Sequence, residues 1–212
     1  MKSIYFIIFI LISFCVQAQK DSLVSSLEYQ NHLNEEFADQ ETSPLTEDDL
    51  ESFQSLSFFD IDEAYIVKAK FIKTESASPF VMPTTTERKP IYMKYGELHF
   101  TLKGKKLSLN VYQSQRLLSD PKYKDYLFIP FTDLTNGEST YGGGRYLDFK
   151  IPASSEVILD FNRAYNPYCA YNGIYSCPIP PKENDLSIKI EAGVKKYEKH
   201  VEKSTSKESS VK

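Results

Sequence analysis

Carboxylates between residues 131 and 184 are the side chains of this sequence best suited to acid–base chemistry. Asp148, Asp160 and Glu183 all lie in this segment. Two carboxylates that face one cleft can act as general acid and general base on a glycosidic or ester bond. Because pairs of this kind occur in almost any sequence, we treat these residues as catalytic candidates of an alternative function, a hydrolase.

The same segment combines arginines with aromatic and amide side chains. Arg145 follows three glycines, whose backbone N–H groups can form a small anion pocket with it. The alternative is that the glycines only shape a turn and that Arg145 pairs with a carboxylate. A nucleotide site is not predicted, because the Lys and hydroxyl residue of a phosphate loop and the dinucleotide spacing are absent. The candidate ligand-binding residues are Tyr141, Arg145, Arg163, Tyr165, Asn166 and Tyr171.

Two cysteines, Cys169 and Cys177, remain after the first 18 residues. An even number of cysteines in an exported chain favours a disulfide, which would contribute about 2.5 kcal/mol through chain entropy. A buried thiol pair or a ligand role stays open. Of the three histidines, only His99 is placed to serve a cysteine nucleophile. The seven residues between the cysteines do not match a zinc site, and we predict no metal and no cofactor.

The first 18 residues have the layout of a secretory signal peptide. A basic residue precedes an apolar run over residues 4–16, and small side chains lead to a cleavage position after Ala18. This run is shorter than the roughly 20 apolar residues that span a bilayer, so we predict an exported chain, periplasmic or extracellular, with no membrane span after cleavage. Lipidation is not expected, because bulky Phe14 precedes Cys15.

Composition restricts the partners of the chain. Its formal net charge is −4, which argues against nucleic acid as a partner. The 11 prolines, 15 tyrosines and 14 phenylalanines point to strands and structured loops rather than to a helical bundle. A small polar ligand is compatible with this composition.

Helical spacing is confined to the N-terminal part. Between residues 21 and 40, the apolar positions Leu23, Leu27, Leu33 and Phe37 predict an amphipathic helix, with Asp21 or Ser22 as its N-cap. A second short helix is predicted after Thr46, because Thr46 can cap it and acidic residues 47–49 suit its first turn.

After Phe58 the apolar residues alternate with a period of two, as in half-buried strands. Residues 97–112 predict a β-hairpin with its turn at Lys103-Gly104-Lys105. Further strands are predicted at residues 65–72, 91–95, 126–131, 146–149, 157–161 and 186–191. We therefore predict a mainly β fold, an antiparallel sandwich or open barrel with an N-terminal amphipathic helix.

Two motifs in this part of the chain have a known counterpart. They are LDFNRAYNPYCAYN at residues 159–172 and CPIPP at residues 177–181. Together with Gly144-Arg145-Tyr146-Leu147 and Ala192-Gly193, they resemble the bacterial family catalogued as domain of unknown function 1684, over roughly residues 53–193. The resemblance implies no activity, because none is established for the family. The chain departs from it at Val194, where an acidic residue is usual, and at Ile174, where some members have histidine.

These observations predict a signal peptide over residues 1–18, a helical lead segment over 19–52, one mainly β domain over 53–194 and a polar disordered tail over 195–212. The predicted function is a non-catalytic cell-envelope module that binds a small polar or carbohydrate-like ligand. The alternatives are the carboxylate hydrolase and a purely structural envelope protein.

Overall fold

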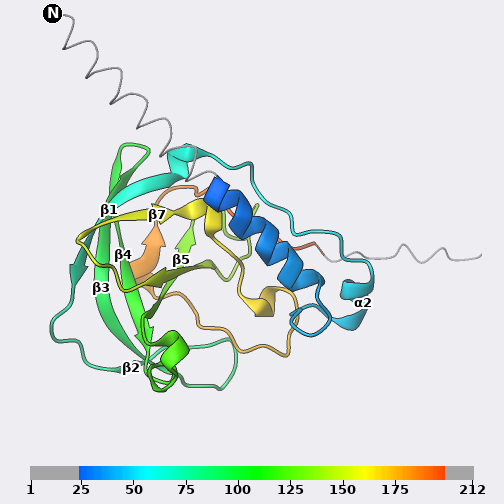
Figure 1. The fold of residues 1–212 in the computed structure, drawn as a ribbon, viewed down its shortest axis with the longest axis horizontal. Helices are drawn as coiled ribbons and strands as arrows, with labels where there is room; N and C mark the ends of the chain where they lie inside the picture. Colours follow the sequence, from blue (N-terminus) through cyan, green and yellow to red (C-terminus); the bar gives the residue numbers. More distant parts are fainter. Residues whose placement is uncertain (1–23, 199–212) are drawn as a thin grey trace, which may run out of the picture.

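One curled sheet forms the body of the protein, and the computed structural model describes it within residues 24–198. Eight strands form this half-barrel (Figure 1), with the order β6-β5-β4-β3-β1-β7. The short β2 pairs with β3, and β8 pairs in parallel with β5, whereas the other pairings are antiparallel. The strands are β1 (Ile66–Lys73), β2 (Phe80–Val81), β3 (Ile91–Leu102), β4 (Lys105–Ser114), β5 (Tyr126–Asp133), β6 (Arg145–Lys150), β7 (Glu156–Asp160) and β8 (Asp185–Leu186). The mainly β prediction is confirmed, as an open barrel rather than a sandwich.

The β3–β4 hairpin forms where the sequence predicts it. Lys103 and Gly104 connect the strands with positive φ angles of 49° and 75°, as a two-residue turn between twisted strands requires. The pairing register shifts between Lys94 and Gly96, so Tyr95 is the extra residue of a bulge. This bulge joins the predicted strands at residues 91–95 and 97–102 into one long strand.

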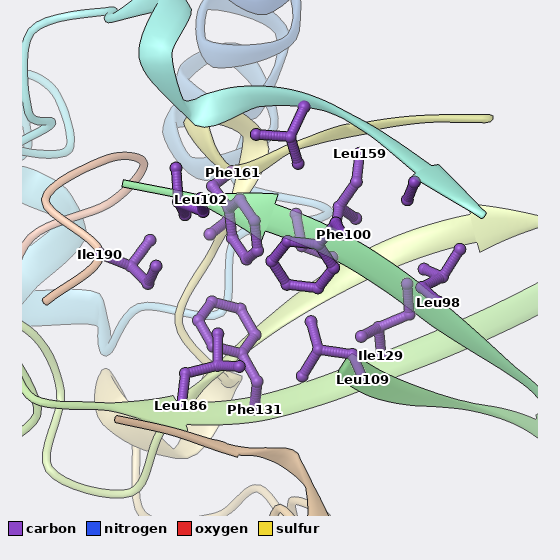
Figure 2. Packing of buried hydrophobic residues seen from close by; sticks show 14 of the residues in the cluster. Leu98, Phe100, Leu102, Leu109, Ile129, Phe131, Leu159, Phe161, Leu186 and Ile190 are labelled. Carbon is purple, nitrogen blue, oxygen red and sulfur yellow. The ribbon is translucent and has the colours of Figure 1, made fainter. Parts of the chain in front are cut away.

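Alternating side chains of these strands fill the concave side of the sheet. In β1, Val67, Ala69 and Phe71 are buried while the lysines between them are exposed. Figure 2 shows Phe100, Phe131 and Phe161 gathered in the centre of this core. The rings of Phe131 and Phe161 meet edge to face at 5.7 Å. Full burial of each such side chain contributes roughly 1.5–3 kcal/mol.

Two helices precede the sheet, as predicted. The first covers residues 24–38 in the described part of the chain and lies beside the half-barrel in Figure 1 (blue). Its buried Leu33 and Phe37 belong to a second core cluster with Tyr171 and Val194, so this helix packs on the body. Helix α2 (Glu47–Glu51) is capped by Thr46, whose side chain accepts from the Asp49 N–H. The predicted caps of the first helix, Asp21 and Ser22, lie outside the described residues.

The predicted strand at residues 186–191 is wrong for most of its length. Only Asp185–Leu186 forms a strand, β8, although Leu186, Ile188 and Ile190 alternate inward as a strand would. The carbonyl of Ile190 is bonded by the Arg145 side chain instead of a neighbouring strand. In this segment the alternation of apolar residues shows which side chains are buried, and it does not show that the segment pairs in a sheet.

Short 3-10 helices, which the sequence patterns did not predict, connect several strands. They are Glu63–Tyr65, Leu117–Ser119, Pro121–Tyr123, Phe161–Arg163, Tyr168–Ala170 and Lys182–Asn184. The turn at Phe161–Arg163 directly follows β7, and Asp160 caps it by accepting from the Asn162 N–H. These turns place the loop side chains that the next section describes.

Some predictions concern residues that the structure does not describe. The signal peptide over residues 1–18 and residues 199–212 of the predicted tail lie outside the described part. The first residues of the predicted tail contact the body, since the Lys195 N–H donates to the Ser57 carbonyl at 2.8 Å and the Tyr197 ring lies 4.9 Å from the Tyr171 ring. Within residues 24–198, no helix is long and apolar enough to cross a membrane.

Candidate functional site

Arg145 is a scaffold residue. Its side chain is fully buried and forms an ion pair with Asp133, with 2.9 Å between Nη2 and Oδ2. It also donates to the backbone carbonyls of Ile190, Ala192 and Val194. The ligand-binding role expected for Arg145 therefore gives way to the alternative, an arginine paired with a carboxylate, because no part of the guanidinium faces solvent.

Asn166 and Tyr171, two other expected ligand residues, are also buried. Asn166 Nδ2 donates to the Lys195 carbonyl at 2.9 Å and to the Tyr171 hydroxyl at 3.3 Å. The Tyr171 ring packs edge to face on Phe37 at 4.7 Å. Both side chains join the N-terminal helix to the C-terminal segment, and their burial leaves them no surface for a ligand.

The remaining expected residues fall into separate places. Tyr141 is half-buried, with its hydroxyl 3.8 Å from Cys169 Sγ. Glu183 is exposed in the turn Lys182–Asn184. Asp148, Asp160 and Arg163, in contrast, line one cleft.

This cleft occupies the gap where the half-barrel fails to close. Its walls come from β6 and β7, the two ends of the strand order, and from the N-terminal helix. The volume is about 810 Å³. We call it the seam cleft, and define it by Tyr29, Tyr126, Asp148, Ile158, Asp160 and Arg163. It has aromatic and apolar surface together with a few charged groups, the usual character of a small-molecule site.

A second hollow, of about 860 Å³, lies over β1, β3 and β4. Exposed strand side chains such as Lys68, Lys70 and Lys106 surround it. These side chains belong to the face of the sheet that alternation directs away from the core. We prefer the seam cleft because there the carboxylates have fixed partners.

Asp148 is the carboxylate of the seam cleft that is both exposed and held in place. Its Oδ1 accepts hydrogen bonds from the hydroxyls of Tyr126 at 2.7 Å and Tyr165 at 2.6 Å. Burial, and then the charge of Asp148, raises the pKa of both tyrosines well above the usual value. Both hydroxyls therefore stay protonated and donate to Asp148 across the neutral pH range.

The backbone of β6 also faces the seam at this point. Tyr146 exchanges both backbone hydrogen bonds with Tyr165, at 2.9 and 3.0 Å, on the side of β6 away from β5. Because backbone groups of a strand alternate in direction, the N–H and C=O of Asp148, two residues on, point to that same side. The seam cleft thus has main-chain donors and acceptors beside its carboxylate.

Asp160 has a mainly structural position in the wall of the cleft. Its Oδ1 accepts from the backbone N–H and the side-chain amide of Asn162, both at 2.9 Å. Its Oδ2 accepts from the Ser26 hydroxyl at 2.6 Å. One oxygen caps the turn after β7 and the other ties the N-terminal helix to β7, which makes this carboxylate poorly suited to proton transfer.

Arg163 forms the cationic rim of the seam cleft. Its guanidinium lies 4.6 Å from the centre of the Tyr29 ring, a cation–π contact. Burial and the nearby charge of Asp148 raise the pKa of Tyr29, and Arg163 acts in the opposite direction. The guanidinium of Arg163 and the carboxylate of Asp148 therefore both act on Tyr29 within this cleft.

The disulfide predicted between Cys169 and Cys177 is not formed, and both are free thiols. The Cys177 sulfur instead accepts a hydrogen bond from the backbone N–H of Cys169 at 3.2 Å. Among the described residues, no group of three or more His, Cys, Asp or Glu side chains could hold a metal ion.

Sequence reasoning missed Tyr29 and Tyr126 of the site, and Ser26, which holds Asp160 in its wall. Tyr126 was placed in a strand. Tyr29 lies four residues before Leu33 and packs against the same cluster as Leu33 and Phe37, so its helical spacing was the available signal. Ser26 meets Asp160 from 134 positions away, so no local pattern reveals it.

Comparison with known proteins places this fold in a family. The family model described as "Protein of unknown function (DUF1684)" matches residues 51–195, most of the chain. The chain belongs to this family. Asp148, Asp160 and Arg163 of this DUF1684 chain lie within the matched range, whereas Ser26 and Tyr29 precede it. One wall of the seam cleft is therefore contributed by a segment outside the family match.

A solved structure shares the fold. It is the solution NMR structure of an uncharacterized protein from Haloarcula marismortui, which is 30% identical with a TM-score of 0.65. The similarity covers 84% of this DUF1684 chain and 96% of the archaeal chain. No curated protein matches the chain.

Proposed function

We propose that the protein is a non-catalytic binding module that holds a small polar, carbohydrate-like ligand in the seam cleft. The observation that carries this proposal is the state of Asp148. It is an exposed carboxylate whose Oδ1 is fixed by two tyrosine hydroxyls. The carboxylate is thus positioned in advance and can accept hydrogen bonds from ligand hydroxyl groups.

The surroundings of Asp148 favour a polyol over a purely apolar or a strongly charged ligand. Tyr29 and Tyr126 offer aromatic surface for the C–H faces of a ring, and Arg163 offers donors on the same cleft. The backbone N–H and C=O of Asp148, on the outer side of β6, add main-chain groups to the cleft. A few oriented polar groups on an apolar floor give a small ligand both affinity and orientation.

Hydrolysis is the second candidate, because Asp148 and Asp160 both line the cleft. A pair of catalytic carboxylates needs one member that can give and take a proton. Asp160 instead holds the amide groups of Asn162 and the hydroxyl of Ser26. The geometry therefore supports binding better than turnover.

The proposal extends to location. The N-terminal 18 residues have the layout of a signal peptide, which would place the module in the cell envelope or outside the cell. N-terminal sequencing of the protein purified from its periplasmic and secreted fractions tests this part. A start at Gln19 supports export, and a start at Met1 in the cytoplasm overturns it.

A ligand screen tests the binding proposal. Mono- and oligosaccharides and polyols are screened by thermal shift, and each hit is titrated by calorimetry against wild type, Asp148→Asn and Glu183→Gln. Loss of a hydrogen bond to a charged group amounts to about 1.5–3 kcal/mol, or roughly 10- to 150-fold in Kd. Asp148→Asn is expected to weaken binding by this factor. Glu183→Gln, which changes an exposed carboxylate outside the cleft, should leave Kd unchanged.

Two results would overturn binding in the seam cleft. One is a screen in which no saccharide or polyol raises the melting temperature. The other is a hit whose Kd is the same in wild type and Asp148→Asn. Chromatography of each hit after prolonged incubation separates the hydrolase alternative, since products that disappear in both Asp148→Asn and Asp160→Asn would establish turnover.

A further inference from the structure

Cys169 and Cys177 meet where the Tyr168–Ala170 turn lies against the segment before Pro178. The position of Cys177 is fixed by residue 85, because Thr85 N–H donates to the Cys177 carbonyl at 2.9 Å and Thr85 Oγ1 accepts from the Cys177 N–H at 3.1 Å. Cys169 N–H reaches the Cys177 sulfur at 3.2 Å. The pair is therefore held together by the backbone of both segments.

The two cysteines are not equivalent. Cys177 is buried, whereas Cys169 is partly exposed. A hydrogen bond from the Cys177 thiol lowers the pKa of Cys169 to about 6, and the same bond, together with burial, raises the pKa of Cys177 well above its usual value. At neutral pH the partly exposed sulfur is the thiolate and the buried sulfur keeps its proton.

The titratable groups around the pair are compatible with a thiolate at Cys169 and a protonated thiol at Cys177. Tyr141 approaches Cys169 from the glycine turn at 3.8 Å, and burial followed by the contact with Cys169 raises the Tyr141 pKa to about 12. Tyr146 of β6 has its pKa raised mainly by burial, and its closeness to the two cysteines acts in the same direction. Arg88 is the positive charge that acts on Cys177. Around neutral pH, both tyrosines therefore stay protonated while Cys169 is ionised.

We propose that Cys169 and Cys177 form a redox-active dithiol, in which Cys169 attacks a hydroperoxide and Cys177 resolves the product. The geometry has two features that this chemistry needs: a partly exposed cysteine that can attack, and a buried second cysteine whose sulfur lies 3.2 Å from the backbone nitrogen of the first. This site is separate from the seam cleft and does not depend on the function proposed for it.

The reaction proceeds in two balanced steps. The Cys169 thiolate attacks the terminal peroxide oxygen, an S–O bond forms, the O–O bond breaks, and the leaving alkoxide or hydroxide takes a proton from solvent. Cys177 then loses its proton and attacks the Cys169 sulfur, the S–S bond forms and the hydroxyl group leaves as water. Overall the dithiol gives two electrons to the peroxide, which becomes an alcohol or water, and one water molecule is released from the Cys169 sulfenic acid.

A metal role accounts less well for the pair. A structural zinc ion takes four ligands, and among the described residues no third His, Cys, Asp or Glu joins the two sulfurs. The inequality between an exposed thiolate and a buried thiol is also what a resolving pair needs, and a purely structural pair does not require it.

The rate of alkylation tests the thiolate assignment. Iodoacetamide reacts with the reduced mature chain over a pH series, and peptide mass spectrometry follows Cys169 and Cys177 separately. Cys169 is expected to show a midpoint near pH 6 and Cys177 to stay unreactive. Cys177→Ala should raise the Cys169 midpoint by at least one unit, whereas Cys177→Ser, which keeps a donor, should raise it less. A Cys169 midpoint that is the same in wild type and Cys177→Ala overturns the assignment.

Peroxide treatment tests the reaction itself. One equivalent of hydrogen peroxide should remove two hydrogens from the mass of wild type, with a peptide crosslinked between Cys169 and Cys177. Cys177→Ala and Cys177→Ser should instead accumulate a sulfenic acid at Cys169 that dimedone traps. Circular dichroism establishes that the variants are folded. If wild-type Cys169 reacts with peroxide no faster than glutathione does, the proposal fails.

Discussion

Arg145 and Asp133 form an ion pair that has no contact with solvent, with both side chains at 0% exposure and 2.9 Å between them. Each partner is also bonded to the C-terminal segment, since Arg145 donates to the Ile190 carbonyl and Asp133 accepts from the Ile190 N–H. One buried pair thus fixes the path of the chain after β8.

Removal of Arg145 should strongly destabilise the protein. Arg145→Ala leaves Asp133 as an unpaired buried charge, which lowers the free energy of unfolding by about 3–5 kcal/mol. Arg145→Lys should be intermediate, because an ammonium group cannot reach all the acceptors that the guanidinium does. Urea denaturation gives the values. Arg163→Ala is the matched control, with a loss of about 1 kcal/mol or less from its contact with Tyr29. A loss for Arg145→Ala that does not exceed this control would contradict the scaffold role.

Gly193 and Gly104 offer a matched pair for separating backbone strain from crowding. Their φ angles are +76° and +75°, so alanine at either site carries a similar backbone penalty of roughly 1–2 kcal/mol. Only at Gly193 would the new Cβ lie 2.4 Å from the Ala164 carbonyl oxygen, whereas the space at Gly104 is open. Gly193→Ala should therefore lose about 1–3 kcal/mol more than Gly104→Ala in chemical denaturation. Equal losses would show that the C-terminal segment is not tightly packed.

The contact between Ser26 and Asp160 should couple the N-terminal helix to the seam cleft. Ser26→Ala removes a 2.6 Å hydrogen bond and should lower stability by about 1.5–3 kcal/mol, since the acceptor is a carboxylate. Asp160→Asn should also weaken the cap of the Phe161–Arg163 turn. A double-mutant cycle measured by thermal and urea unfolding isolates the shared part. Strictly additive losses would mean that the two side chains do not interact.

Glu97 provides a pH-dependent contribution to stability. The hydrogen bond from Lys94 lowers the pKa of Glu97, and His99, at 2.9 Å, acts in the same direction. A carboxyl group with a lowered pKa stabilises the folded state above the unfolded value near 4.3, and that stabilisation is lost as the pH falls through the folded-state pKa. The stability difference between wild type and Glu97→Gln should therefore shrink on going from about pH 7 to about pH 3. A difference that grows with acid would reverse the assigned sign.

Strands were predictable where alternation and sheet pairing coincide. β1, β5, β6 and β7 all lie within a residue or two of their predicted bounds. In β1 the buried side chains recur every second position, whereas β5 is buried continuously from Leu127 to Phe131 and was recognised as a short apolar run. Residues 186–191 show the same alternation as β1, but at Ile190 both backbone groups bond side chains, the N–H that of Asp133 and the carbonyl that of Arg145. A hydrophobic pattern reports which side chains are buried, and it does not report which group bonds the backbone.

The site was predictable only in part, for a related reason. Asp148, Asp160 and Arg163 stood out in the sequence as charged residues within or beside predicted strands. Their use depends on partners far along the chain, such as Ser26, 134 positions from Asp160. In the sequence, Arg145 and Arg163 look alike, since both are arginines beside predicted strands. Only their burial in the structure shows that Arg145 belongs to the scaffold and that Arg163 lines the seam cleft. The spacing of Cys169 and Cys177 likewise showed that they could meet, but not in which oxidation state.

The hydrogen bonds that Arg145 donates to the C-terminal segment affect when the protein can fold during its synthesis. The carbonyl acceptors of Arg145 lie 45 to 49 positions later in the chain, so they leave the ribosome well after the guanidinium does. Until then, folding of the sheet would bury a cation without most of its partners, which the energetics of buried charges oppose. The body of the protein therefore cannot close strand by strand as it is translated. It must wait for residues 190–194, which supply these carbonyls, so the sheet is expected to stay open while those residues are still inside the ribosome.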